Sequence, residues 1–439
     1  MSSSDPPKEY TTRAWLVIMG AFTCAFCTVG FLNSFGIFEE YYASNQLAGS
    51  PQSTIAWLGA ISIFFLFLIS AVAGALLDAF GPTILVCTGS LGTVLSVMMT
   101  SLCHQFWQFF LAQGVLLGIS MSLVTWPCLG LVGQYIKRKR AVAMGIVLGG
   151  SSLGGIVWPI AINQLLQKPN IGFGWTMRIV GFIMIPLLAF TCIVCKSPPP
   201  PPPPTREEGG SMKRTDGDVE IHEKGSPTRK EEIKVLLKQP ALQLTCVSMF
   251  VIYLSMFSPF FYATSYATKM GFSSELSFYT VSIVNGASFF GRVLPGLLAD
   301  KYGKFNCCIV STIAAGIVAL CWTKATTVAG LVIWCAAYGF ASGGIISLQQ
   351  ACAAQVSTPG TLGLSIGTVV GSSAFSAMAN VPVSGALAEK YGYLALSLYS
   401  GVPLLIWLID PACLRVYEKT VTFVHNHLLQ IVQDFPQAA

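Results

Sequence analysis

A succession of long apolar runs constrains this chain more than any other feature of its sequence. Crossing ~30 Å of hydrocarbon takes about 20 largely apolar residues in a helix, and twelve stretches of the sequence meet that requirement. The first six cover residues 14–38, 54–77, 83–103, 107–133, 141–166 and 175–195. The second six cover residues 241–268, 277–299, 307–323, 328–353, 362–387 and 394–414. The sequence therefore predicts an all-α membrane protein with twelve transmembrane helices.

The composition supports a lipid environment. Of the 439 residues, 53% are hydrophobic and 10% are charged, against roughly 25% charged in soluble domains. This small number of charged residues cannot cover a water-facing surface. We therefore expect a multi-pass protein in a lipid bilayer. The net charge of +6 is spread over short loops, which favours a role in membrane topology over nucleic-acid binding.

One polar segment divides the apolar runs into two sets. Residues 196–240 open with seven consecutive prolines, 198–204, and then hold many charges and few large apolar side chains. Such a composition cannot bury a core. We expect an N-terminal tail at 1–13, a six-helix bundle at 14–195, a disordered linker at 196–240, a second six-helix bundle at 241–414 and a C-terminal tail at 415–439.

The orientation follows from the basic residues. Residues 137–140 read Lys-Arg-Lys-Arg between the fourth and fifth runs, and Lys301 and Lys304 lie between the eighth and ninth. These positions share a side with both termini and the linker. Cytoplasmic loops carry the excess of lysine and arginine, so the sequence predicts cytoplasmic termini, and we expect the protein in the plasma membrane.

A glycine and aspartate motif occurs twice. The pattern Gly-x-Leu-x-Asp-x-x-Gly follows the second run and recurs after the eighth, with its fixed positions at Gly74, Asp78, Gly81, Gly296, Asp300 and Gly303. We call the constant separation of the two copies, from Gly74 to Gly296, the repeat spacing. The glycines permit a sharp reversal of the chain, and the aspartate can cap the next helix or accept bonds from neighbouring helix ends. We interpret both copies as gating turns; a tight helix hairpin without a gating role is the alternative.

The same repeat spacing relates glycines in the fifth and eleventh runs, Gly145 with Gly367 and Gly149 with Gly371. Glycines four apart let helices pack backbone to backbone, and glycine with a nearby proline makes a helix bendable. These four positions therefore indicate either static packing or a hinge. A shared spacing in separate places indicates two pseudo-symmetric halves, an architecture typical of secondary transporters.

Arg292 is the most expensive residue in the predicted membrane region. A charged side chain near the bilayer centre costs several kcal/mol, so it is a functional candidate. It precedes Asp300 by eight residues, or ~12 Å along a helix, and shares one helix face with Asn285 and Ser288. A guanidinium offers a bidentate fork to a carboxylate. The alternative is a structural arginine bonded to carbonyls or to a partner helix.

The chain resembles the major facilitator superfamily, and within it the fungal monocarboxylate-transporter-like branch. The resemblance rests on the paired turns, on the segments 13–15, 30–36, 57–59, 139–145 and 285–300, and on Arg292. It implies two six-helix bundles and alternating access around a central site, with Arg292 binding a substrate carboxylate. Two departures affect proton coupling: Ser288 stands where proton-coupled animal relatives have an aspartate, and Asn33 appears where they have a lysine.

Further polar and aromatic residues within the runs are candidates for substrate contact, although each could instead bond a neighbouring helix: Asn33, Trp126, Tyr253, Gln349, Gln350 and Asn380. With Arg292, Asn285 and Ser288 they predict a site for a small organic solute, a monocarboxylate or other organic anion, moved with or without a coupled proton. We expect a monomeric secondary or facilitative transporter. Export of a larger metabolite, or a non-transporting sensor, are the alternatives.

The sequence does not favour an enzyme. The four histidines all lie outside the interiors of the apolar runs, and no phosphate-binding Gly-x-x-x-x-Gly-Lys-Ser/Thr loop occurs. The fourteen cysteines lie in or beside apolar runs, where cysteine acts mostly as a small hydrophobic residue. We therefore expect no cofactor and no metal.

Overall fold

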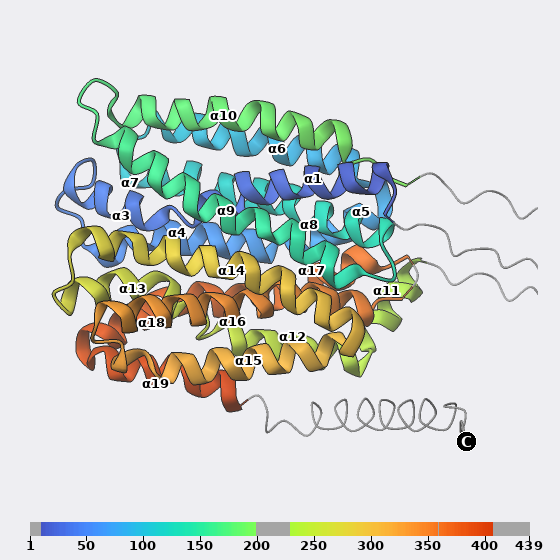
Figure 1. The fold of residues 1–439 in the computed structure, drawn as a ribbon. Coiled ribbons are helices and arrows are strands. Elements are labelled where there is room, and N and C mark those ends of the chain that lie inside the picture. The colour runs from blue at the N-terminus through green and yellow to red at the C-terminus, as the bar shows by residue number, and fades with distance from the viewer. Residues whose placement is uncertain (1–9, 199–228, 359, 407–439) are drawn as a thin grey trace, which may run out of the picture.

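The computed structural model describes residues 10–198, 229–358 and 360–406, and this part of the chain consists of helices joined by turns and loops, with no strand. Ten helical segments are long and apolar enough to cross a membrane, and α15 and α19 are shorter apolar helices. Together they give the twelve predicted spans (Figure 1). The protein is a multi-pass membrane protein with an all-helical fold.

The first six spans form the N-terminal bundle. They are α1 (Thr12–Cys27) with α2 (Val29–Leu32) and α3 (Phe35–Ser44); α4 (Gln52–Leu68) with α5 (Ser70–Phe80); α6 (Pro82–Thr100); α7 (Phe106–Phe109) with the π-helix η1 (Phe110–Leu116) and α8 (Leu117–Tyr135); α9 (Arg140–Leu166); and α10 (Gly172–Val194).

The last six spans form the C-terminal bundle. They are α12 (Pro240–Tyr253) with α13 (Ser258–Lys269); α14 (Ser274–Tyr302); α15 (Lys304–Leu320), followed by the 3-10 helix η2 (Trp322–Lys324); α16 (Val328–Gln355); α17 (Leu362–Ser372) with α18 (Ala374–Lys390); and α19 (Gly392–Ile406).

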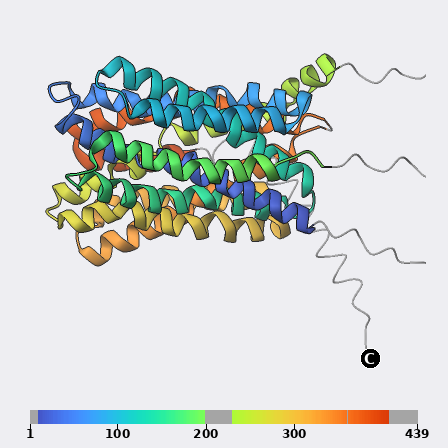
Figure 2. The same cartoon turned by 90° about the horizontal axis from the view of Figure 1, so that it is seen from above.

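The helices run alongside one another between two ends of the molecule (Figures 1 and 2). At one end α1 begins, α10 ends and α11 (Arg229–Lys238) lies beside the start of α12. We call it the linker end, and the opposite end the far end. The sequence did not predict α11, which falls within the expected disordered linker. Residues 199–228 of that linker, the tail 1–9 and residues 407–439 lie outside the described residues.

Four spans are interrupted, which the apolar pattern did not predict. The first breaks at Thr28 and again at Asn33 and Ser34, the second at Ile69, the seventh at residues 254–257, and the eleventh at Ser373. Serine and asparagine favour such breaks because their side chains compete for backbone hydrogen bonds. Pro259 adds to the seventh break, since proline lacks an amide hydrogen and disfavours helix in the residue before it.

Candidate functional site

The two predicted gating turns connect the bundles at the linker end. Asp78, at the end of α5, accepts hydrogen bonds from the amides of Gly363 (2.9 Å) and Leu364 (2.8 Å). These amides lie at the start of α17, where the helix dipole is positive, so the carboxylate is held by charge as well as by hydrogen bonds. Asp78 therefore joins the second span to the eleventh.

Asp300 makes the equivalent contact on the other side of the interface. Its two carboxylate oxygens accept from the amides of Ala141 and Val142, each at 3.1 Å, at the start of α9. The repeat spacing separates Asp300 from Asp78, and it also separates Ala141 and Val142 from Gly363 and Leu364. The helix after each turn, α6 or α15, has no side-chain cap. Each aspartate thus binds a helix of the opposite bundle.

The turns themselves depend on glycine. Gly81 and Gly303 have φ angles of 77° and 98°, a region in which a side chain is strained. Gly296 lies against α9, where an added Cβ would come 2.9 Å from the carbonyl oxygen of Ala141. A Cβ on Gly74 would likewise meet the carbonyl of Gly363.

The four predicted hinge glycines all lie where the bundles touch. A Cβ on Gly145 would meet the carbonyl of Arg292, and one on Gly367 would meet the carbonyl of Ser70. Gly149 packs against the ring of Phe289, 3.1 Å from its added Cβ. Any larger residue here would push the two backbones apart.

The two glycine-rich helices differ in their continuity. Gly371 packs beside Ser70 Oγ, 3.3 Å from its added Cβ, and the helix breaks two residues later at Ser373. By contrast, α9 continues from Arg140 to Leu166 through Pro159. The sequence left a hinge open for both the fifth and the eleventh span, and in this structure only the eleventh is interrupted.

Arg292 lies between the bundles on α14 and is 3% exposed. Its Nη1 donates to the carbonyl of Leu148 and to the hydroxyl of Ser151, both on α9. Its Nε has no hydrogen-bond partner among the described residues. In this conformation the arginine bonds a partner helix, which is the alternative that the sequence left open for it.

The duplicated sequence places Ser70 at the position equivalent to Arg292, one repeat spacing earlier in the chain. Ser70 Oγ donates to the carbonyl of Gly367, on the eleventh span, at 2.7 Å. Each of these residues therefore bonds across the interface in its own half. Only the second half uses a permanent positive charge for the purpose.

Two asparagines extend the contact around Arg292. Asn33, at the break in the first span, donates to Asn285 Oδ1 at 3.3 Å and to the carbonyl of Ser151 at 3.5 Å. Asn285 also donates to the carbonyl of Val281 within its own helix. Asn33 and Arg292 thus both bond Ser151 of α9, and Asn285 lies one turn further along, beside Gly155. Ser288, from the same predicted face, instead packs on Gly343 of α16, and its hydroxyl is buried without a partner in the described structure.

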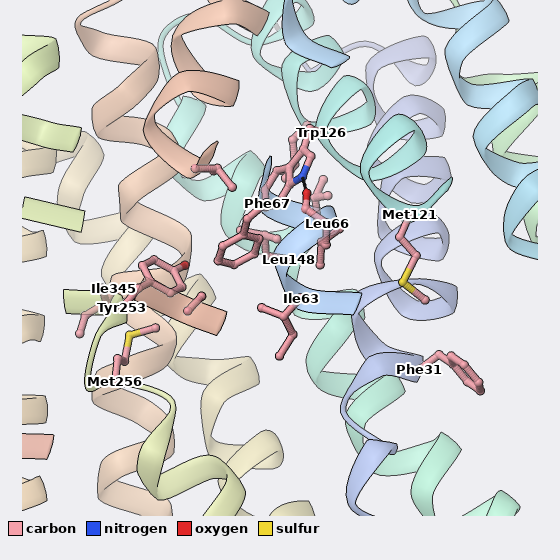
Figure 3. Close-up of a cluster of buried hydrophobic side chains, with 14 of the residues drawn as sticks. Phe31, Ile63, Leu66, Phe67, Met121, Trp126, Leu148, Tyr253, Met256 and Ile345 are labelled. Atoms are coloured by element: carbon pink, nitrogen blue, oxygen red, sulfur yellow. Dashed lines mark hydrogen bonds between the residues drawn. The ribbon is translucent and has the colours of Figure 1, made fainter. Parts of the chain in front are cut away.

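A second group of predicted residues lies between α12 and the N-terminal bundle (Figure 3). Gln349 Nε2 donates to the hydroxyl of Tyr253 at 2.7 Å. The Tyr253 ring meets Phe67 edge to face at 5.2 Å, and Phe67 in turn meets Trp126 at 6.0 Å. Trp126 Nε1 donates to the carbonyl of Leu66 at 2.8 Å, which fixes the indole in the apolar cluster.

Asn380 belongs to the break in the seventh span. Its Nδ2 donates to the carbonyl of Leu254 at 2.6 Å and to Ser258 Oγ at 3.1 Å. Because the break frees that carbonyl from the helix, Asn380 replaces a lost backbone hydrogen bond. In this conformation its donor group is used by the protein.

Several buried polar atoms near these residues have no partner among the described residues. Three are the hydroxyls of Ser34, Ser255 and Ser373, one at each of three helix breaks. Others are Gln349 Oε1 and both amide atoms of Gln350. An unsatisfied buried polar atom costs about 1–3 kcal/mol, so each is a place where a ligand or water would be stabilised.

The sequence missed some of the participating residues. Ser151 and Ser70 were recognisable only through the repeat spacing, and Phe67 looks like any other apolar residue of a span. In the part of the chain that the structure describes, no group of three or more His, Cys, Asp or Glu side chains is placed to hold a metal ion.

Comparison with known proteins gives consistent results. Residues 15–328 match the Major Facilitator Superfamily. An MFS-type transporter of Aspergillus fumigatus is 44% identical over 398 residues, 90% of each chain. The agnestins efflux protein of Paecilomyces divaricatus is 40% identical, covering 95% of this chain and 91% of its own. The aspyridones efflux protein of Emericella nidulans is 37% identical, covering 90% of this chain and 76% of its own.

Two solved structures show a similar fold. The human organic anion transporter MFSD10 has a TM-score of 0.65 at 16% identity, covering 92% of this chain and 99% of its own. The fucose:proton symporter FucP of E. coli has a TM-score of 0.65 at 11% identity, covering 90% of this chain and 97% of its own. At these identities the likeness concerns the fold alone.

Proposed function

The chain belongs to the major facilitator superfamily, and we propose that this transporter exports a small organic anion by alternating access, with Arg292 as the residue that binds the negative charge. As a member of this superfamily it is not an enzyme, and it binds a small-molecule substrate. The efflux direction is supported by the names of relatives at 40% and 37% identity, which are called efflux proteins. None of the relatives reported above is called a monocarboxylate transporter, so we do not restrict the proposal to that class.

The position of Arg292 carries the proposal. It is a buried charge at the bundle interface, and its Nε is not used by the described protein. Its present partners are a carbonyl and a hydroxyl, both neutral. A carboxylate accepts hydrogen bonds roughly twice as strong as those that a neutral acceptor accepts. Its two oxygens can also accept two parallel N–H bonds from the guanidinium at once. An organic anion that reaches Arg292 would therefore displace Leu148 and Ser151.

Such a displacement would couple substrate binding to the conformational change. We propose that the two aspartate contacts, both formed here, hold a state that is closed at the linker end. When α9 and α14 separate, Arg292 loses its partners on α9 and becomes available to an anion from that side. When the anion leaves at the far end, Arg292 can return to α9 and restore the closed contact.

Proton coupling is not required by this mechanism. The sequence has no aspartate or glutamate between Ser277 and Ala299, and Ser288 lies one turn before Arg292. We propose that the charge of the substrate is balanced by Arg292 itself. We further propose a monomer in the plasma membrane with cytoplasmic termini, as the basic residues at the linker end suggest.

Metabolite profiling tests this function. Cells that express the intact chain should accumulate at least one organic acid in the medium that cells expressing Arg292→Ala retain. Both variants must reach the membrane in equal amounts, measured by surface labelling. Equal export of every acid by the two variants would remove Arg292 from the binding role. Ligand binding without any flux would favour a sensor over a transporter.

A further inference from the structure

Helix α11 lies at the linker end and leads directly into the seventh span. It ends at Lys238, and α12 begins at Pro240. Gln243 Nε2, in the first turn of α12, donates to the carbonyl of Leu237 at 3.0 Å. This short, hydrogen-bonded connection holds α11 at the level where the seventh span enters the membrane.

Three lysines form one face of α11. Lys230, Lys234 and Lys238 are exposed and spaced four residues apart, so they lie in one row along the helix. Leu236 is 0% exposed and lies about 200° around the helix from Lys234. The helix therefore packs on the protein through Leu236 and turns its lysine row outward.

Two further properties of this row indicate an anionic partner. Like charges at four-residue spacing repel one another and destabilise a helix; Glu231, three residues before Lys234, offsets part of this cost, and bound anions would lower it further. Beside the row, Leu237 is 43% exposed, and Val235 on another side of the helix is 62% exposed. Cations combined with exposed apolar side chains on one helix are typical of helices that lie in the headgroup layer of a membrane.

We propose that the lysine row of α11 binds anionic phospholipid headgroups in the leaflet at the linker end. The phosphate and carboxylate groups of these headgroups are complementary to the three ammonium groups, and the helix leads directly into the membrane-entering end of the seventh span. Each lysine near an anionic leaflet strengthens attraction about fivefold. Three together therefore favour an anionic lipid over a zwitterionic one by about a hundredfold.

The side of α11 that faces the protein, opposite the lysine row, lies near the α5–α17 contact. A Cβ added at Gly360 would come 3.8 Å from Glu232 Oε2, so α11 reaches the turn that precedes α17. The first amides of α17 are those that bind Asp78. Lipid binding would thus hold α11 in place beside the α5–α17 contact. The proposal does not depend on which substrate is carried.

Native mass spectrometry of the purified full chain tests the proposal, by titration with phosphatidylserine against phosphatidylcholine. The triple variant K230Q/K234Q/K238Q should bind phosphatidylserine about a hundredfold more weakly, with phosphatidylcholine binding unchanged. The triple arginine variant K230R/K234R/K238R should keep the preference because it keeps the charge. As a matched control, K168Q/K324Q/K390Q removes three exposed lysines at the far end and should change nothing.

Three results would overturn the proposal. The glutamine variant could bind phosphatidylserine as the unmodified chain does. It could keep its fold, with an unchanged melting temperature, and lose both lipids equally, which would show that the lysine row does not distinguish anionic from zwitterionic headgroups. The far-end variant could lose phosphatidylserine to the same extent, which would indicate a general effect of charge and no site on α11.

Discussion

Replacing Asp78 and Asp300 with asparagine should open the linker end of the transporter. Each aspartate accepts two backbone hydrogen bonds, at 2.8–3.1 Å, from the first turn of a helix in the opposite bundle. Asparagine is nearly the same size but carries no charge, and its amide NH2 cannot accept a bond. Each variant therefore loses one hydrogen bond and the attraction to the helix dipole while the backbone stays intact.

The magnitude follows from these losses. A hydrogen bond to a charged group contributes about 1.5–3 kcal/mol, and a charge at a helix end about 0.3–1 kcal/mol. We take ~2 kcal/mol per contact, which shifts the ratio of closed to open molecules roughly 30-fold. The two contacts share no residue, so their effects should add, and the double variant should shift the ratio on the order of 1,000-fold.

Pulsed electron paramagnetic resonance can measure this shift. Spin labels at Lys137 and Tyr302, on opposite bundles at the linker end, should show one short distance in the unmodified chain and a growing long-distance population in the variants. Because the chain has native cysteines, the labels are introduced as unnatural amino acids. Glu389→Gln is a matched control, since Glu389 is exposed and lies near the end of α18, away from both aspartate contacts.

The rate of transport gives a second readout for the same variants. Turnover should fall while substrate affinity changes less than about twofold, because neither aspartate contacts the proposed substrate site. Unchanged distance distributions in both single variants and the double variant would refute the reasoning. The two turns would then be purely structural.

Three other predictions concern a contact between the bundles, a contact inside the C-terminal bundle and proton coupling. Gly145→Val should prevent closure of the linker end and reduce transport at least tenfold, because its side chain would meet the carbonyl of Arg292. Gly286→Ala is the control and should be tolerated, because the nearest atom to its added Cβ is 3.7 Å away. Tyr253→Phe should lower thermal stability by about 1–2 kcal/mol, since it leaves Gln349 unpaired; an unchanged melting temperature would contradict this. Export of a fully ionised anion, measured with a radiolabelled substrate, should vary less than about threefold between pH 6 and 8; a tenfold change at pH 6 would indicate proton coupling.

The sequence predicted the fold well because its signals are strong and local. A span needs a long apolar run, and each of the twelve predicted runs contains a helix. The repeat spacing also located the residues that join the bundles, since Asp78 and Asp300 bind amides that are related by the same spacing. A duplicated pattern of this kind reports on packing that one copy alone would not reveal.

The helix breaks and the partners of Arg292 were beyond this kind of prediction. Apolar composition does not distinguish a continuous span from one that breaks at Asn33 or Ser255, because a single polar residue barely changes the pattern. The carbonyl of Leu148 has no sequence signal at all, since every residue has one. Helix α11 was missed because its charged composition is that of a disordered segment, although Leu236 and Ile233 pack against the core on one face.

Flux through proteoliposomes that carry Arg292 variants is the most direct test of the central claim. The unmodified chain, Arg292→Lys and Arg292→Ala would be reconstituted at equal density and loaded with an anion that profiling identifies as exported. We predict that Arg292→Ala abolishes flux and that Arg292→Lys, which keeps the charge but loses the bidentate fork, reduces it strongly. Flux of the anion through Arg292→Ala at the rate of the unmodified chain would contradict the assignment of Arg292 as the anion-binding residue.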